Sequence, residues 1–402
     1  MENKLILVTN PGSSSRKYAL YRITKSKDEF LCGLHFEFED GKIICTFENA
    51  DGTKEPLDMQ LRTLSGSVVA LRQILTERGL ISEDQPLDAV LARVAASGDF
   101  FTEDHIVNDE VLSQLERAKQ RAPLHVPVIV DEIEAFVDEF PDTKVVTISD
   151  SGFHTARPKL HKYYAIDTEL AENHEIKRYG MHGLSIGSVV ETMRAKKILP
   201  EKAIICHLGS GASLTAVMDG KSFDTTMGYT PLDGIMMATR SGAMDPAAAF
   251  AVARALETDD LQKVEEYLNK KSGLLGVSGI SNDMRDIISL SMSDNDRAKF
   301  AFDMFVYRVQ VAIGQMAAAM NGADAIVFTA TIGERSAPVR KAIGEKLSYL
   351  GCDMDLTKNE SATGAKGPEN IAKEGSKPIW VLHTDESAEI LRRAKLLLAT
   401  VE

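Results

Sequence analysis

The sequence predicts an α/β protein made of two related halves. Short apolar runs rich in β-branched residues alternate with stretches whose apolar residues recur at helical spacing, which is typical of sheets layered with helices. A strand, a small-residue turn and a second strand occur twice, so that Gly12 in the first turn is matched by Gly209 in the second. The chain has 402 residues, and because single cores stop growing at roughly 250 to 300 residues, we expect two domains.

The repeated hairpins are the elements that the pattern places most directly. The predicted strands and turns are 5–8, 10–15 and 18–23 in the first half and 203–208, 209–213 and 214–217 in the second. Consecutive backbone amides in such a turn form an anion-binding concavity that adds no net charge. Either turn alone could be an ordinary tight turn, but the repetition favours a phosphate-binding role for both. Lys17 follows the first turn and could reach a phosphate, although a solvated strand lysine fits the pattern equally well.

Three further strands each end in a polar loop. They are predicted at 144–148, 325–328 and 378–382. A long amphipathic helix is predicted at 294–320, and the segment 357–377, rich in Gly, Lys, Asn and Glu, is predicted as a surface excursion. We divide the chain into a first domain, 1–150, closed by a C-terminal helix at 385–402, and a second domain, 151–384.

The composition indicates a cytoplasmic protein that binds small molecules. The formal net charge of −13 means that the surface repels nucleic acid and acidic membrane surfaces, so an anionic substrate must meet a local cluster of positive charge. The four cysteines stand far apart, which argues against a zinc site or a disulfide framework. The N-terminal apolar run is too short for a signal peptide, and no stretch approaches the roughly 18 to 20 apolar residues that span a bilayer.

Two acidic residues follow predicted strands. Asp150 comes after 144–148 and Glu386 after 378–382, so each is expected at the carboxyl edge of a sheet, where α/β proteins place their ligands. Mg²⁺ binds through few protein carboxylates and keeps several waters, so these two residues and Asn10 would suffice to hold it. The alternatives are a turn residue for Asp150 and, for Glu386, a first-turn carboxylate that offsets the helix dipole.

Two arginines stand within apolar surroundings. Arg93 lies in the apolar run 90–96, and Arg240 follows apolar residues and precedes a glycine. A buried arginine needs an anion, so we expect these two to bind a substrate carboxylate and a phosphoryl group, with an internal salt bridge as the alternative for each. Four histidines lie in loops beside prolines, glycines or aromatic residues, and they carry weight only as a set: His125, His154, His182 and His207.

These segments, taken together, resemble the acetate kinase family over nearly the whole chain. The block 225–245, which contains Met-Gly-Tyr-Thr-Pro-Leu and Thr-Arg-Ser-Gly, is the most specific of them. The other motifs that carry the resemblance are 10–17, 93–94, 122–127, 150–154, 178–183, 206–213 and 328–334. The resemblance implies the duplicated fold shared by acetate and sugar kinases, heat-shock protein and actin, with a cleft between its two domains. It also implies a homodimer.

The resemblance further implies direct in-line transfer of a phosphoryl group from ATP to acetate, giving acetyl phosphate and ADP, assisted by Mg²⁺ or Mn²⁺. Arg93 would bind the substrate carboxylate, while Arg240 and His182 would stabilise the phosphoryl group in flight. The residues that would organise the metal ion are Asn10, Asp150 and Glu386. The residues that would hold the donor phosphates or the transferring group are Ser13, Ser15, Lys17, His125, His207, Gly209, Ser210, Gly211, Thr331 and Gly333.

The sequence departs from the family pattern on both sides of the reaction. The positions of the acyl pocket are Ala95, Leu124, Met181 and Pro231, where the family usually has valine, leucine, phenylalanine and proline. Smaller and more adaptable side chains predict a roomier pocket that also accepts propionate or butyrate. On the donor side, Ser210, Thr331 and Arg335 replace asparagine, glycine and asparagine, which raises pyrophosphate as an alternative to ATP.

Two other classes of function remain open from the sequence. One is a non-catalytic actin-like relative that binds nucleotide, because the residues around Arg93 differ from the family pattern. The other is a hydrolase that uses a pair of carboxylates, but no closely spaced acidic pair lies in a small-residue loop. The retained arginines, with Asp150, His182 and Glu386, favour the kinase.

Overall fold

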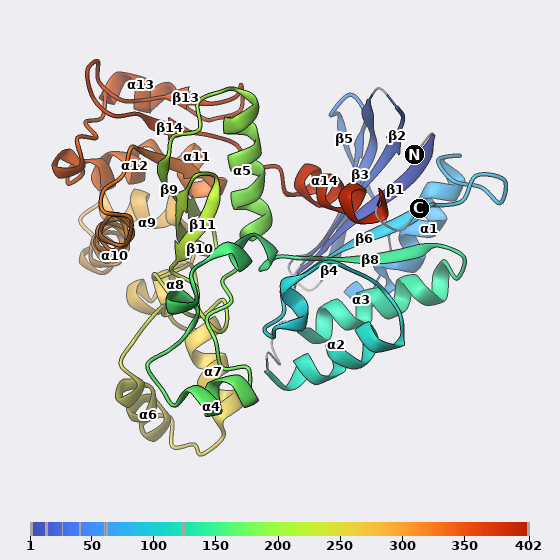
Figure 1. Ribbon diagram of the computed structural model, residues 1–402, viewed down its shortest axis with the longest axis horizontal. Helices are drawn as coiled ribbons and strands as arrows, with labels where there is room; N and C mark the ends of the chain where they lie inside the picture. The colour runs from blue at the N-terminus through green and yellow to red at the C-terminus, as the bar shows by residue number, and fades with distance from the viewer. Residues whose placement is uncertain are drawn as a thin grey trace. The chain divides into compact units, whose positions relative to one another are not determined.

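The computed structural model describes residues 3–12, 15–25, 27–39, 42–59, 61, 63–121 and 126–399. The chain forms two compact units (Figure 1). Unit 1 comprises Met1–Gly152 with Glu386–Glu402, and unit 2 comprises Phe153–Asp385. Each unit has its own mixed sheet and its own helices, so the predicted α/β class is confirmed.

Unit 1 is built on an eight-stranded sheet. Its strands, in spatial order, are β5 (Lys54–Leu57), β4 (Lys42–Asn49), β3 (Asp28–Glu39), β2 (Ser15–Ile23), β1 (Lys4–Pro11), β6 (Ala89–Val94), β8 (Lys144–Ser149) and β7 (His105–Ile106). β1 and β2 form the predicted hairpin, while β1, β6 and β8 run parallel to one another. Their carboxyl ends therefore meet at one edge of the sheet, which brings residues 10, 93 and 150 close together.

The helices of unit 1 cover both faces of that sheet. They are α1 (Ser67–Glu77), α2 (Asp109–Arg121), α3 (Val126–Glu139) and α14 (Glu386–Ala399). Thr9 Oγ1 donates to Glu132 of α3 at 2.8 Å, whereas the side chain of the next residue, Asn10, donates to Glu386 of α14 at 3.0 Å. Because successive side chains of a strand point to opposite faces, α3 and α14 lie on opposite faces of the sheet.

Unit 2 repeats the arrangement around a six-stranded sheet. Its strands, in spatial order, are β11 (Lys221–Thr225), β10 (Ala212–Met218), β9 (Lys202–Leu208), β12 (Ala325–Thr329), β14 (Ile379–Val381) and β13 (Glu369–Asn370). β9 and β10 form the second predicted hairpin, and β12 runs parallel to β9 as β6 does to β1. In each sheet, the first strand of the hairpin thus has the second hairpin strand on one side and a parallel strand on the other, in agreement with the predicted duplication.

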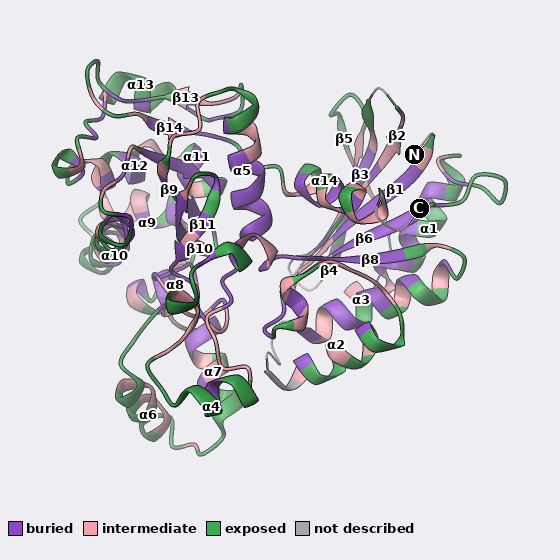
Figure 2. Cartoon of the chain, viewed as in Figure 1, coloured by how far each residue is buried: buried purple, intermediate pink, exposed green. Residues whose placement is uncertain are grey.

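The helices of unit 2 are mostly short, apart from α5 (Gly183–Ala195) and α10 (Asp296–Met320). α5 is buried from Gly183 to Val190 and becomes exposed towards its C-terminal end (Figure 2). The others are α4 (Thr168–Asn173), α6 (Pro246–Ala255), α7 (Leu261–Lys270), α8 (Gly273–Ser278), α9 (Met284–Ser291), α11 (Ala330–Arg335), α12 (Ala337–Gly344) and α13 (Leu356–Ser361). α10 begins two residues after the predicted start because Asn295 caps it, its side chain accepting a hydrogen bond from the amide of Ala298.

The segment 357–377 has more regular structure than the sequence predicted. Most of its residues are exposed or half-buried, as expected for a surface excursion, but it contains most of α13 and all of β13, and Asn359 and Ala362 are buried. Arg340 of α12 is completely buried and donates to the carbonyls of both residues, at 2.7 and 3.0 Å. The guanidinium satisfies these buried carbonyls with hydrogen bonds. Because no pattern of apolar residues accompanies them, the composition of the segment did not indicate that Asn359 and Ala362 are buried.

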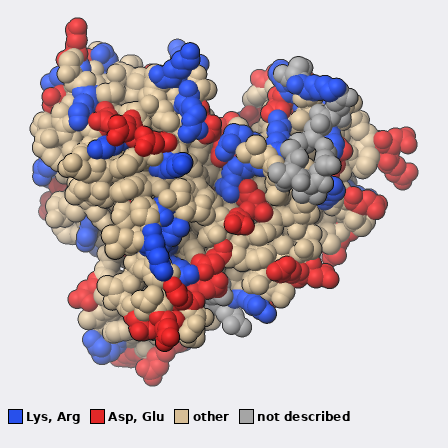
Figure 3. Space-filling view, viewed as in Figure 1, with Lys and Arg blue, Asp and Glu red and all other residues tan. Residues whose placement is uncertain are grey.

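The surface carries charges of both signs, and the cysteines are buried. On the face shown in Figure 3, acidic and basic side chains are interspersed over both units. Each of the four cysteines is a buried free thiol. Among the described residues, no helix combines the length and the apolar character that crossing a membrane requires.

Candidate active site

The predicted carboxyl edge of the unit 1 sheet brings four polar residues together. Arg93, near the end of β6, donates from Nη2 to Asp150 Oδ2 at 2.8 Å and from Nη1 to Asn10 Oδ1 at 3.1 Å. Nη1 also lies 3.7 Å from Glu386 Oε2, which in turn accepts from Asn10 Nδ2 at 3.0 Å. Residues from two parallel strands, the loop after a third and the first turn of α14 thus form one cluster, which we call the Arg93 cluster.

The charges of the Arg93 cluster are strongly coupled. The side chain of Asp150 is fully buried, and those of Arg93 and Glu386 are each 21% exposed. Burial alone would lower the pKa of Arg93, but the charges of Asp150 and Glu386 outweigh it and raise that pKa well above its usual value. Arg93 is therefore permanently charged. One guanidinium and two carboxylates leave the cluster with a net charge of −1, which favours a further cation.

The internal salt bridge that was the alternative for Arg93 is present in the structure. Its partners, however, are the two carboxylates predicted to organise a metal ion. The Nε–H group of Arg93 is buried and has no hydrogen-bond partner among the described residues. Because a buried donor without a partner is costly, an acceptor such as a substrate carboxylate oxygen would satisfy it after a small side-chain movement.

The donor set of the Arg93 cluster fits Mg²⁺. Asn10, Asp150 and Glu386 offer only oxygen ligands, and Mg²⁺ prefers one or two carboxylates with several retained waters. Within the described part of the chain, no group of three or more His, Cys, Asp and Glu side chains is arranged to hold a metal. A hard, partly hydrated ion matches the oxygen ligands of the cluster.

Two residues that the sequence did not single out fix the position of α14. Arg393 of α14 donates from Nε to Asp104 at 3.0 Å and from Nη1 to the carbonyl of Ser149 at 2.6 Å. Asp104 also accepts from the amide of Ser149 at 2.8 Å. This ion pair, 14% exposed on both sides, ties α14 to the end of β8 and so holds Glu386 beside Asp150.

Unit 2 brings two of the predicted histidines together. The rings of His182 and His207 are stacked with centroids 4.1 Å apart. His182 precedes α5 in the left-handed region, with φ of 61°, and its Nδ1 lies 2.9 Å from Ser213 Oγ on β10. Nδ1 of His207, on β9, lies 2.7 Å from Ser185 Oγ. With each Nδ1 held by a hydroxyl, both rings have a fixed orientation.

The turn of the second hairpin lies against His182 and Arg240. A Cβ atom at Gly211 would lie 3.3 Å from His182 Nε2 and 3.4 Å from Arg240 Nη1, so both groups come close to the turn and a larger residue there would crowd them. The turn closes through the amide of Gly209, which donates to the carbonyl of Gly211 at 3.0 Å, and the side chain of Ser210 is exposed. Arg240 also has long contacts, 3.4 Å to the carbonyl of Pro231 and 3.6 Å to Met237 Sδ. The predicted phosphate turn and phosphoryl-stabilising residues are thus neighbours.

The loop after β12 adjoins the same turn. Ala330 has φ of 63°, which is uncommon for a residue other than glycine, and it packs near Gly209. Thr331 is exposed, and Gly333 is buried in contact with β9 and β12. The sequence predicted these two residues at the donor site, and the structure places them in α11, next to the second hairpin turn.

Other predicted site residues are only partly located. Ser13, Leu124 and His125 lie outside the described residues. Ser15 begins β2, where its carbonyl accepts from the amide of Gly12 at 2.8 Å, and Lys17 pairs with Asn10 across the hairpin with an exposed side chain. For the acyl pocket, Ala95 follows β6 in unit 1, whereas Met181 and Pro231 are buried in unit 2.

A histidine beside α11 predicts a pH-dependent stability. His383 Nδ1 lies 2.9 Å from Glu334 Oε2, and this hydrogen bond raises the pKa of His383 above its ordinary value. A raised folded-state pKa adds stability that is complete below the unfolded pKa of about 6.5 and is lost as the pH rises through the folded pKa. We expect the melting temperature of His383→Gln to fall below wild type by more at about pH 6 than at about pH 8.5. His383 is 61% exposed, so the effect is small, and an equal difference at both pH values would contradict it.

The sequence profile of the acetokinase family matches residues 5–392. The chain belongs to the acetokinase family. Acetate kinase 1 of Lactococcus lactis subsp. lactis (strain IL1403) is 38% identical over 397 residues, which cover 97% of this chain and 98% of that protein. The acetokinase resemblance drawn from the sequence motifs is confirmed.

Solved structures of acetokinases confirm the fold. A propionate kinase from Francisella tularensis subsp. tularensis SCHU S4 has a TM-score of 0.87 at 33% identity, covering 97% of this chain and 98% of that one. An acetate kinase from Porphyromonas gingivalis has a TM-score of 0.85 at 31% identity, covering 98% and 100%. The acetokinase described here is therefore an enzyme, a kinase that transfers a phosphoryl group to a carboxylate.

Proposed function

We propose that the protein transfers the terminal phosphoryl group of ATP reversibly to acetate, giving acetyl phosphate and ADP, in the cytoplasm. The observation that carries this proposal is the approach of His182 and Arg240 to Gly211, because it places two hydrogen-bond donors at a turn suited to a phosphate. Phosphoryl transfer to an acid requires no nucleophilic side chain, so positioning and charge neutralisation suffice.

Arg93 is the proposed anchor of the acid. Its Nε–H group, which has no partner in the described part of the chain, and its permanent charge suit a carboxylate. Its hydrogen bonds to Asp150 and Asn10 hold the guanidinium plane. Asn10, Asp150 and Glu386 are the residues that would hold Mg²⁺, which when bound supplies positive charge against the polyphosphate. Asp150 and Glu386 also keep Arg93 from swinging away, so the same carboxylates orient the acid-binding group.

His182 and Arg240 are the proposed donors to the phosphoryl group. The Ser213 hydroxyl can donate to Nδ1 of His182, which leaves Nε2 protonated and directed at the space beside Gly211. Arg240 Nη1 adjoins the same space, so its charge and the imidazole N–H can share the equatorial oxygens of the transferring group. His207 supports this arrangement by stacking on His182.

The decisive test is an assay of acyl phosphate formed from acetate, ATP and Mg²⁺. In the reverse direction, acetyl phosphate is offered with either ADP or orthophosphate. Formation of ATP from ADP supports the proposal. Product formation only with orthophosphate would replace ATP by pyrophosphate, the alternative suggested by the exposed Thr331 at the first turn of α11. Absence of turnover in both directions would overturn the proposed function.

The acyl pocket predicts tolerance of longer acids. Ala95 and Met181 are the positions where the family usually has valine and phenylalanine, and one methylene is worth only about 1 to 3 kcal/mol of discrimination. We expect kcat/KM for propionate to lie within about tenfold of that for acetate. Ala95→Val should widen this ratio in favour of acetate, whereas Ala70→Val, in α1 of the same unit, should leave it unchanged. A steep preference for acetate in the wild type would refute the roomier pocket.

We also propose that the enzyme is a homodimer joined through unit 2. Phe300, Tyr307 and Val311 lie at i, i+7 and i+11 on α10, so they share one helix face, and each is more than half exposed. Phe250 of α6, a helix without buried residues, is 62% exposed. Analytical ultracentrifugation of wild type and of Tyr307→Glu/Val311→Glu tests the proposal: dissociation of a wild-type dimer supports it, and a dimer unaffected by the changes contradicts this surface.

A further inference from the structure

The loop that leads into His182 holds an unfavourable backbone conformation. Both His182 and Gly180 have positive φ, 61° and 79°. For a residue other than glycine, this conformation costs on the order of 1–3 kcal/mol and persists only where the surroundings impose it. The amides of Tyr179 and Gly180 both donate to the carbonyl of Gly228, at 2.9 and 3.2 Å, which holds one side of the loop.

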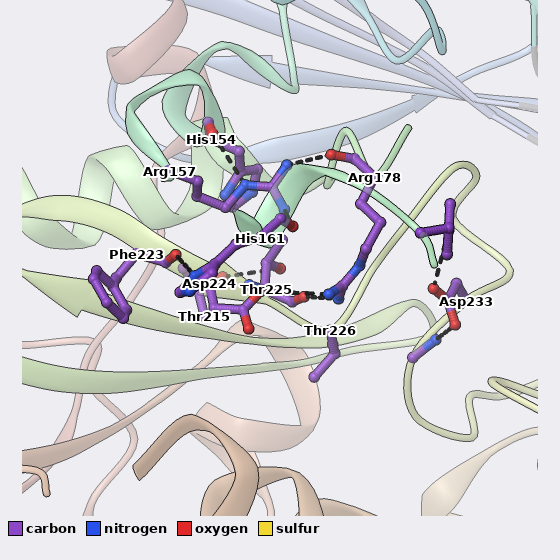
Figure 4. Close-up of polar contacts among 12 residues, drawn as sticks. His154, Arg157, His161, Arg178, Thr215, Phe223, Asp224, Thr225, Thr226 and Asp233 are labelled. Atoms are coloured by element: carbon purple, nitrogen blue, oxygen red, sulfur yellow. Dashed lines mark hydrogen bonds and ion pairs between the residues drawn. The ribbon is translucent and has the colours of Figure 1, made fainter. Parts of the chain in front are cut away.

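Two buried side chains hold the carbonyls on the other side of the loop. Arg157 Nη2 donates to the carbonyl of Arg178 at 2.5 Å (Figure 4) and to that of Tyr179 at 2.7 Å. His154 Nε2 lies 2.9 Å from the carbonyl of Met181. His154 is 1% exposed and Arg157 is 3% exposed. Burial and the nearby charge of Arg178 lower the pKa of Arg157 to about 10, but it stays protonated at neutral pH. Three of the four carbonyls before His182 are thus held by side chains.

The contacts of His154 define its protonation. A carbonyl only accepts, so Nε2 of His154 carries the proton that binds the carbonyl of Met181. Nδ1 lies 2.8 Å from Ser222 Oγ on β11, and that hydroxyl can donate to it when the ring is neutral. The ring also fills the space beside Gly180, where a Cβ would lie 2.8 Å from His154 Cδ2. His154 therefore connects β11 to the residue immediately before His182.

We infer that His154 is a positioning residue for phosphoryl transfer. Its hydrogen bond to the carbonyl of Met181 fixes the peptide that joins Met181 to His182, and thereby both the proposed acyl-pocket side chain and the proposed phosphoryl donor. The inference rests on the proposed function, because it assigns His154 an effect on that reaction. His154 lies behind the loop and acts only through it, so its loss should lower kcat and leave the KM for ATP nearly unchanged.

Two substitutions at His154 distinguish the roles of its two ring nitrogens. The amide nitrogen of His154→Gln can take the place of Nε2 and donate to the carbonyl of Met181, whereas that of His154→Asn lies near the place of Nδ1 and cannot reach it. Since a misplacement of about 1 Å can cost on the order of 10²-fold in rate, we expect His154→Asn to lose roughly 10- to 100-fold in kcat and His154→Gln to retain most of it. Ser222→Ala, which keeps the Met181 contact, should stay near wild type.

The outcomes of the test are distinct. Equal kcat for His154→Asn and His154→Gln would overturn the inference, provided that the wild type phosphorylates acetate and His182→Ala is impaired. A wild type without kinase activity, or a fully active His182→Ala, would instead overturn the proposed function or the role of His182. If His154→Asn does not fold, nitrogen NMR of histidine-labelled wild-type protein decides: a slowly exchanging Nε2 proton on His154 supports the inference, and a freely exchanging or titrating ring contradicts it.

Discussion

Replacing Arg240 by alanine is expected to lower kcat by roughly 10²- to 10³-fold, the usual loss when one preorganised charge-stabilising donor is removed. The guanidinium adjoins the space beside Gly211, where the transferring phosphoryl group is proposed to lie. Removing the side chain also breaks its contacts to the Pro231 carbonyl and to Met237 Sδ, so we expect the free energy of unfolding to fall by about 0.5–3 kcal/mol, the usual range for one substitution. Steady-state kinetics and thermal unfolding of the same preparation measure both effects.

Arg240→Lys is the matched control for this prediction. Lysine keeps the charge but loses the planar fork that can bind two oxygens at once, so it should recover only part of the rate. A near-normal kcat in Arg240→Ala would remove Arg240 from the site. A large loss of stability together with the loss of rate would mean that Arg240 supports the loop rather than the reaction.

Replacing Arg93 by alanine is expected to reduce both activity and stability. The change leaves Asp150, which is fully buried, and Glu386 without their shared cation. Breaking a buried ion pair by removing one partner costs up to about 3–5 kcal/mol, because the remaining charge is uncompensated. With the proposed acid anchor also gone, kcat/KM for acetate should fall by at least about 10²-fold.

The double variant Arg93→Ala/Asp150→Asn separates the two effects. It removes both charges, so stability should recover while activity should not. Arg72→Ala is the matched surface control, because Arg72 pairs with Glu139 but is 54% exposed, and its loss should change little. Recovery of activity in the double variant would mean that Arg93 serves only to neutralise Asp150 and does not bind the acid.

The sequence predicted the candidate site best where a local motif, such as a turn or a strand end, itself carries the functional residues. Small-residue turns after apolar strands predicted both hairpins, and the rule that ligands bind at the carboxyl ends of strands predicted Asp150 at a metal site with Asn10. Arg93 was predicted only from its apolar surroundings, and the parallel pairing of β6 with β1 and β8 brings it to the same edge. Glu386 joined them because the strand and helix at the C-terminal end of the chain were readable from hydrophobic periodicity.

The contacts that hold the site in shape could not be predicted from local sequence patterns. Asp104 and Arg393 pair across 289 positions, and neither stands in a recognisable motif. The left-handed conformations of His182 and Ala330 are invisible in a sequence, because neither residue is glycine and only tertiary contacts impose them. Arg340 likewise looks like a surface arginine until the carbonyls around it are seen.

The position of Glu386 near the C-terminal end of the sequence has a consequence for biosynthesis. β1, β6 and β8 leave the ribosome early, but the helix that completes their cluster is translated only after every residue of unit 2. Arg93 and Asp150 are therefore synthesised well before Glu386, the second carboxylate of their cluster. The proposed site for a divalent ion can therefore be complete only after all of unit 2 has been translated.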